Sequence, residues 1–167
     1  KLVLDLRGNP GGYLEAAVDM ASWFLPSGNL VVEEDYGGHT GSIMHRSRGY
    51  DVFNENLNMV VLIDKGSASA SEILAAALRH YGMAKLVGTN TFGKGSVQEL
   101  VNITPETSLK ITVARWLGPD EQQIPSEGIT PDVKVEITDE DRKAGLDPQL
   151  EKAAELLIRA ERPMIFA

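Results

Sequence analysis

Hydrophobic positions in the first half of the chain alternate between strand-like runs and helix-like spacings. Residues 2–6 and 59–63 form short apolar runs, and the run at 59–63 is typical of a strand covered on both faces of a sheet. Apolar residues recur every three or four positions over 14–25 and 73–81, which predicts two amphipathic helices. Strands and helices that alternate in this way indicate an α/β fold.

The remaining apolar runs are short and predict further strands. These strands are expected at 29–32, 86–88, 97–103, 109–116 and 133–137.

The second half of the chain predicts a strand pair and a closing helix. The turn-like TPETS separates the runs at 97–103 and 109–116, which favours an antiparallel pair. The segment DPQLEKAAELL predicts a helix with Asp147 as its N-cap and Pro148 in its first turn. The polar stretch 35–56 predicts a surface excursion or hairpin. We therefore expect one compact α/β domain, with a mixed β-sheet and flanking helices.

Composition narrows the class of protein without identifying it. The 167 residues are 43% hydrophobic and 24% charged, as in an ordinary globular protein. A net charge of −8 argues against nucleic acid or an anionic membrane surface as the main partner. The chain has no cysteine, which excludes disulfides and thiolate metal sites. Because it begins with KLVLDL, already a strand, we expect it to be an N-terminally truncated piece of a longer protein.

The stretch DKGSASASEI is the first candidate for chemistry. It places Ser69 after a strand and loop, in the first turn of a predicted helix. There the N–H of Ala70 and the helix dipole could stabilise a developing oxyanion. Ser69-x-x-Glu72 equally fits a capping box, in which the serine only caps the helix. Both interpretations stay open from these residues alone.

A nucleophilic serine also needs a base. His39, His45 and His80 do not stand in a triad-like context, which leaves lysine as the candidate. Lysine accepts a serine proton only in its neutral form, which burial favours. Lys94 lies between two glycines, where the backbone could carry its amine inward, although a plain turn lysine fits equally well.

The segment GTNTFGK also matches the G-x-x-x-x-G-K of a phosphate-binding loop. That loop requires Ser or Thr next and must open a helix, but Gly95 follows here and the next residues favour a strand. A nucleotide site is therefore not expected.

Four motifs in order carry a resemblance to a known family. DLRGNPGG, GSASASEILAAAL, VGTNTFGKGSVQ and EGITPD are similar to motifs of the C-terminal processing peptidases, tail-specific serine proteases with a Ser–Lys dyad. The resemblance runs from residue 2 to about 157 and implies a fold like the ClpP and crotonase superfamily. It also implies a PDZ domain upstream, which this chain does not contain.

The resemblance implies roles for five residues. Ser69 would be the nucleophile, Lys94 the base, and Gln98 the residue that positions the lysine. The N–H groups of Gly12 and Ala70 would form the oxyanion hole. An offset of four would also place Lys94 and Gln98 on one face of a strand.

Two segments depart from the family pattern. The family often has an acidic residue at the position of His80, and a shorter aromatic-rich pattern in place of LGPDEQQI. Neither departure touches the predicted dyad.

The predicted function is that of a serine endopeptidase that cleaves protein or peptide substrates near their C-termini. No cofactor or metal is expected, and nucleic acid is not a predicted partner. The resemblance implies an extracytoplasmic location, in the periplasm, cell envelope or lumen. Membrane anchoring through an upstream segment and a homo-oligomeric state both stay open.

Two alternatives remain beside the protease. One is a catalytically silent binding or scaffold module of the same fold, which includes a folded but inactive fragment. A crotonase-like acyl-CoA enzyme is more distant, because that chemistry uses a carboxylate base.

Overall fold

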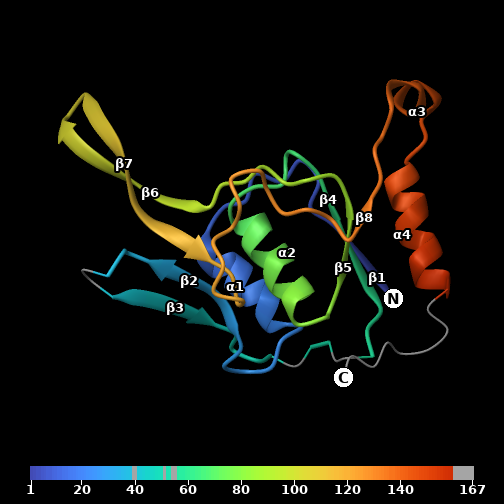
Figure 1. Cartoon of the computed structure of the whole chain (residues 1–167), viewed down its shortest axis with the longest axis horizontal. Coiled ribbons are helices and arrows are strands. Elements are labelled where there is room, and N and C mark those ends of the chain that lie inside the picture. Colours follow the sequence, from blue (N-terminus) through green and yellow to red (C-terminus); the bar gives the residue numbers. More distant parts are fainter. Residues whose placement is uncertain (39–40, 51, 54–55, 160–167) are drawn as a thin grey trace.

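The computed structural model describes residues 1–38, 41–50, 52–53 and 56–159 (Figure 1). The strands are β1 (Leu2–Asp5), β2 (Leu30–Asp35), β3 (Ser42–Arg46), β4 (Met59–Ile63), β5 (Lys85–Gly88), β6 (Ser96–Thr104), β7 (Thr107–Leu117) and β8 (Val133–Lys134). The helices are α1 (Leu14–Ser22), α2 (Ala70–His80), α3 (Asp139–Ala144) and α4 (Pro148–Arg159).

A parallel sheet with the strand order β1-β4-β5-β8 forms the centre of the fold. Every residue of β4 is buried, and its side chains alternate between the two faces of the sheet. Val61 and Ile63 pack in the cluster that contains α1 and α2, whereas Val60 and Leu62 pack with Ala153 of α4. The sheet is therefore sandwiched between helices, which explains the unbroken apolar run of β4.

The antiparallel strands form a second, separate sheet in the order β3-β2-β7-β6. β6 and β7 form a long hairpin that projects from the body of the molecule as an arm (Figure 1). The predicted α/β class is confirmed, and so is the antiparallel pair. The parallel and antiparallel pairings lie in different sheets of one chain.

Most predicted elements form close to their expected positions, with a few differences. The polar stretch 35–56 contains β3, which pairs with β2 as a hairpin, while His39 lies outside the described residues. β8 is shorter than predicted. Helix α3 was not predicted, although Thr138 and Asp141 form a capping box at its start. Asp147 does cap α4, since its Oδ1 accepts a bond from the Leu150 N–H at 3.0 Å.

Two properties of the described residues bear on possible function. No helix among them is long and apolar enough to cross a membrane. Within the same residues, no cluster of three or more His, Cys, Asp or Glu is placed to hold a metal ion.

We expect the central strand to dominate the stability of the fold. Leu62 is 0% exposed, so Leu62→Ala should lower the free energy of unfolding by about 3 kcal/mol through lost burial and a residual cavity. The matched control is Leu100→Ala in the projecting arm, where 63% exposure predicts a loss below about 0.5 kcal/mol. Urea denaturation measures both, and equal losses would contradict the assignment of the core.

Candidate active site

The candidate residues gather at the carboxyl ends of three neighbouring parallel strands. β1, β4 and β5 end at Asp5, Ile63 and Gly88, and the loops that follow them carry Gly12, Ser69 and Lys94. In open parallel sheets this edge is where ligands bind, because the loops of adjacent strands converge there. The sheet topology therefore brings together residues that are far apart in the sequence.

Ser69 differs from the two serines on either side of it. Ser67 and Ser71 are buried, at 0% and 4% exposed, whereas Ser69 is only partly buried. The backbone of Ser69 has φ 55° and ψ −119°, a conformation that non-glycine residues rarely adopt. Such strain costs about 1–3 kcal/mol and gathers at functional sites. The middle serine is thus held in a strained, accessible position directly before α2.

The capping arrangement at the start of α2 is also present. The Glu72 carboxylate accepts the Ser69 N–H at 3.0 Å, and the Glu72 N–H donates to the Ser69 carbonyl at 2.9 Å. Ser69 and Glu72 have the disposition of a capping box, yet the Ser69 hydroxyl closes no well-formed cap hydrogen bond. The close hydrogen bonds of this cap are those of the Glu72 carboxylate and of the backbone.

Glu72 holds the two candidate catalytic loops together. It is 0% exposed, and its Oε2 accepts both the Ser69 N–H and the Lys94 N–H at 3.0 Å. Its Oε1 accepts the Thr91 hydroxyl at 2.5 Å and the Gly93 N–H at 2.8 Å. Four donors on one carboxylate fill the capacity of an acceptor-only group. The sequence pattern indicated only the cap, although a carboxylate within the apolar SEILAAAL was a signal that Glu72 had a buried partner.

The FGKG turn packs against the segment that contains the EGITPD motif. Gly93 has φ 92° and meets the Ser126 carbonyl, while Gly95 meets the Ile124 carbonyl. A side chain at either glycine would collide with that backbone. The Ile129 N–H adds a bond of 2.7 Å to the Thr91 hydroxyl. The glycines around Lys94 thus allow two loops to pack closely at the site.

Lys94 is half-buried, and within the described residues its amine forms no ion pair with a carboxylate. Gln98 lies on β6 and is exposed. Lys94 precedes the first residue of β6, and the pairing with β7 is irregular between Val97 and Gln98. Simple strand alternation therefore does not place Lys94 and Gln98 on one face, since a bulge shifts the pattern by one residue.

His80 lies at the other end of α2 from Ser69. The helix has 11 residues, so the two ends are about 16 Å apart. His80 is exposed and makes an edge contact with the Tyr81 ring at 4.8 Å between centroids. Its position separates it from the site.

The candidate oxyanion donors lie beside Ser69. Gly11, at φ 89°, presses against the Ala68 carbonyl and the Ala70 nitrogen, so no side chain would fit there. Its own N–H donates to the Asn9 side-chain oxygen at 3.0 Å. Among the described residues, no hydrogen bond uses the N–H of Gly12 or of Ala70. Both N–H groups are therefore free to bind an oxygen.

A small cavity opens next to these donors. It has a volume of about 120 Å³, and its lining includes Gly12 and Ala70. Most of the lining is apolar and includes Leu6, Ala16, Ala17, Met20, Leu74 and the 86% exposed Tyr13, while Asn9 and Ser71 are its polar side chains. The chemistry of this lining suits an apolar side chain.

A partly exposed serine in a strained turn before a helix, beside free N–H donors and the loop that carries Lys94, is typical of an enzyme that attacks carbonyl groups. The chain belongs to peptidase family S41, whose sequence profile matches residues 1–135. The resemblance to the C-terminal processing peptidases is thereby confirmed. Helices α3 and α4 lie beyond the matched residues.

Individual relatives agree with this assignment. A "Probable CtpA-like serine protease" of Staphylococcus saprophyticus is 42% identical over 136 residues, 81% of this chain and 28% of that protein. The "Carboxy-terminal processing protease CtpA" of Bacillus subtilis is 39% identical over 137 residues, 82% of this chain and 29% of that protein. The chain therefore spans less than a third of these relatives.

Structural comparison points the same way. The structure of the photosystem II D1 C-terminal processing protease aligns with a TM-score of 0.71 and 34% identity. The alignment covers 81% of this chain and 34% of that one.

Glu72 should be indispensable for the geometry of the site. In Glu72→Gln the side-chain NH₂ would face backbone N–H donors, so at least one buried donor loses its acceptor. We expect the free energy of unfolding to fall by about 2–4 kcal/mol. Urea denaturation measures this loss. Glu99→Gln on the exposed part of β6 is the control, and equal effects of the two substitutions would contradict the role of Glu72.

Strain at Ser69 predicts a gain in stability when the strain is removed. Ser69→Gly should be more stable than Ser69→Ala by about 1 kcal/mol, because only glycine adopts a positive φ without strain. Both variants remove the hydroxyl, so the comparison isolates the backbone. Thermal and urea unfolding measure the difference. An alanine variant as stable as the glycine variant would show that the backbone at residue 69 carries no strain.

Proposed function

We propose that this chain carries the catalytic core of a serine protease that cleaves proteins near their C-termini with a Ser–Lys dyad. One observation carries the proposal: a single buried carboxylate, that of Glu72, binds the backbone N–H groups of both Ser69 and Lys94. A helix cap alone does not require the lysine loop to be bound to the same oxygen.

In the proposed reaction the Ser69 hydroxyl attacks the scissile carbonyl. The neutral amine of Lys94 accepts the hydroxyl proton and later delivers it to the leaving amine. The N–H groups of Gly12 and Ala70 bind the oxyanion, and Gln98 orients the lysine amine. Water then releases the acyl group from Ser69. These steps need no metal or cofactor.

The substrate proposal rests on the cavity beside Gly12 and Ala70. A peptide whose carbonyl oxygen points at these N–H groups would place a neighbouring side chain at the cavity mouth. An apolar residue beside the scissile bond would then be preferred, because most of the lining, with Leu6, Met20 and Leu74, is apolar. The proposed substrates are protein chains with accessible, apolar C-terminal segments.

The compartment and the assembly belong to the same proposal. The resemblance to C-terminal processing peptidases supports work outside the cytoplasm, in the periplasm, envelope or a lumen. The proposal also includes a domain that captures substrate tails and a membrane anchor in an upstream segment, while the homo-oligomeric state stays open.

Cleavage of an unstructured protein with an apolar C-terminus tests the proposal. Ser69→Ala should lower kcat/KM about 10⁴-fold, because nothing replaces the nucleophile. Lys94→Ala should lower it about 100- to 10,000-fold, the usual contribution of a general base. Mass spectrometry of the products across pH 6 to 10 measures the rates and locates the cut.

The controls are Ser108→Ala and Lys110→Ala, which change an exposed serine and an exposed lysine on β7 in the projecting arm. A second readout is labelling of Ser69 by a fluorophosphonate, which reports an activated serine without turnover. A folded chain that neither cleaves nor becomes labelled would favour the scaffold alternative over the protease.

A further inference from the structure

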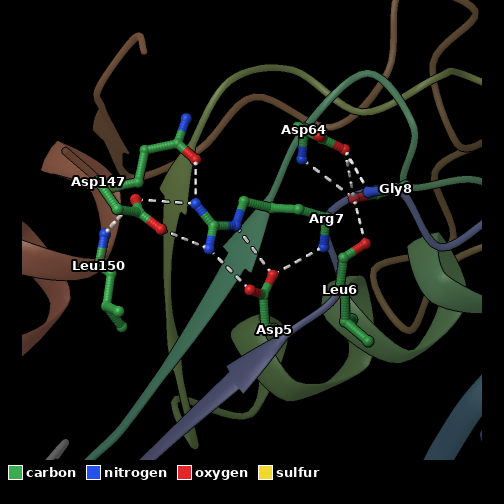
Figure 2. Close-up of polar contacts among 9 residues, drawn as sticks. Asp5, Leu6, Arg7, Gly8, Asp64, Asp147 and Leu150 are labelled. Carbon is green, nitrogen blue, oxygen red and sulfur yellow. Dashed lines mark hydrogen bonds and ion pairs between the residues drawn. The ribbon is translucent and has the colours of Figure 1, made fainter. Parts of the chain in front are cut away.

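The C-terminal helix is tied directly to the strand end that leads into the candidate oxyanion loop. The connection is Arg7, which lies between Asp5 and Asp147 (Figure 2). Asp147 stands immediately before α4, in the part of the chain that the family match does not cover. The connection therefore joins the family core to a segment outside it.

The Arg7 guanidinium is fully saturated with acceptors. Its Nε and Nη2 donate to the two oxygens of Asp5 at 2.9 and 2.7 Å. Its Nη1 and Nη2 donate to the two oxygens of Asp147 at 2.9 and 2.8 Å. The remaining Nη1 hydrogen goes to the side-chain oxygen of Gln149 at 3.1 Å. Two bidentate carboxylates fix both the position and the plane of the guanidinium.

Gln149 extends this connection toward the central sheet. Gln149 is only 2% exposed, and its side-chain amide donates to the Val135 carbonyl at 2.8 Å. The Val135 N–H in turn donates to the Gly88 carbonyl at the end of β5, at 2.9 Å. The start of α4 is thus anchored near the ends of β1 and β5, which lie on either side of β4.

The chain passes from Arg7 straight into the loop that carries Gly12. The N–H of Gly8 donates to Asp64 at 2.8 Å, and the Asn9 carbonyl accepts the Ala68 N–H at 3.0 Å. Figure 2 shows Arg7 reaching toward α4 on one side while Gly8 meets Asp64 on the other. Any displacement of Arg7 is therefore passed to the bonds that hold this loop against Ser69.

We propose that Asp147 is a positioning residue, which holds Arg7 and thereby keeps the loop of Gly12 in register with Ser69. Docking of α4 then sets the geometry of the oxyanion donors, and α4 becomes a point at which activity can be adjusted. The effect on catalysis rests on the proposed function. The effect on the loop itself does not.

Surface ion pairs alone carry little energy, but this arrangement differs from an ordinary surface pair. The Arg7 side chain is only 18% exposed, and it is shared between two carboxylates. By comparison, the Arg142–Asp139 pair on α3 is 67% and 82% exposed. That second pair provides a matched control on a neighbouring helix.

Asp147 both caps α4 and binds Arg7, and substitutions can separate these two roles. Asp147→Asn keeps a good N-cap for α4, because asparagine accepts the Leu150 N–H as well as aspartate does. It breaks the bidentate contact, since the asparagine NH₂ faces the donors of Arg7. Asp147→Ala removes both duties, and Asp139→Asn on α3 is the control. Arg7→Lys keeps the charge but cannot bridge two carboxylates.

Amide hydrogen exchange is the first readout, because it does not depend on activity. In Asp147→Asn the amides of Gly8, Asn9 and Ala68 should exchange at least about tenfold faster, while those within α4 stay protected as in the wild type. Unchanged exchange at all three positions would overturn the proposal. Faster exchange throughout α4 would show that the substitution had damaged the helix, and Arg7→Lys would then decide by the same readout.

Cleavage kinetics form the second readout. Asp147→Asn should lower kcat by about 10- to 100-fold with KM within about twofold, since small misplacement of a catalytic group slows the reaction more than it weakens binding. If the wild type cleaves and Asp147→Asn has the same kcat, the positioning role is wrong. If the wild type neither cleaves nor becomes labelled at Ser69, the proposed function fails and hydrogen exchange alone decides the positioning role.

The pH dependence of stability gives an independent check. Hydrogen bonds from Arg7 hold the pKa values of Asp5 and Asp147 below their usual range, and both carboxylates raise the pKa of Arg7. A lowered carboxyl pKa adds stability that is present above the ordinary value near about 4 and is lost as the pH falls further. The Tm of the wild type should therefore fall more steeply below about pH 4 than the Tm of Asp147→Asn. Parallel slopes would show that Arg7 and Asp147 are not coupled.

Discussion

The geometry of the site depends on the buried carboxylate of Glu72. A buried carboxylate is costly unless donors surround it, and here four donors from two segments do so. Because one oxygen accepts the N–H groups of both Ser69 and Lys94, the backbones of these two residues are held at one point. The same carboxylate closes the first turn of α2. The start of the helix and the lysine loop are therefore parts of one arrangement.

The backbone around Glu72 departs from ordinary local preferences at several positions. Ser69 has a positive φ, although a residue at the start of a helix normally has an extended backbone. Glycines at positions 11, 93 and 128 stand where backbone meets backbone and a side chain would collide. Strain and close approach of this kind are expected at functional sites, because the surrounding bonds hold the chain there. The motifs of this family therefore have a direct physical explanation in the contacts between loops.

The hydrogen bonds of Arg7 connect the candidate site to a segment that lies beyond the residues matched by the family profile. Asp5 and Arg7 stand two residues apart at the end of β1, so both side chains can lie on one side of the strand end. Asp147 and Gln149 approach them from the start of α4. The fold thus connects the C-terminal helix to the loop of Gly12 by contacts across 140 positions of sequence.

The sequence by itself determined the α/β class and nearly all of the elements, whereas the candidate dyad came from the resemblance to a known family, since the residues alone left the roles of Ser69 and Lys94 open. The unbroken run of β4, the Ser69 motif and the FGKG turn are local signals, and each was readable without coordinates. Helix α3 is only six residues long and has no buried side chain, so no apolar periodicity marked it. Only the tertiary structure decided that Glu72 binds the lysine loop and that Asp147 holds Arg7. It also decided that, within the part of the chain that the structure describes, the N–H of Gly12 makes no hydrogen bond whereas that of Gly11 does. Those facts depend on which strand ends are neighbours, and pairing between distant strands is set by packing of the whole core, which local sequence does not encode.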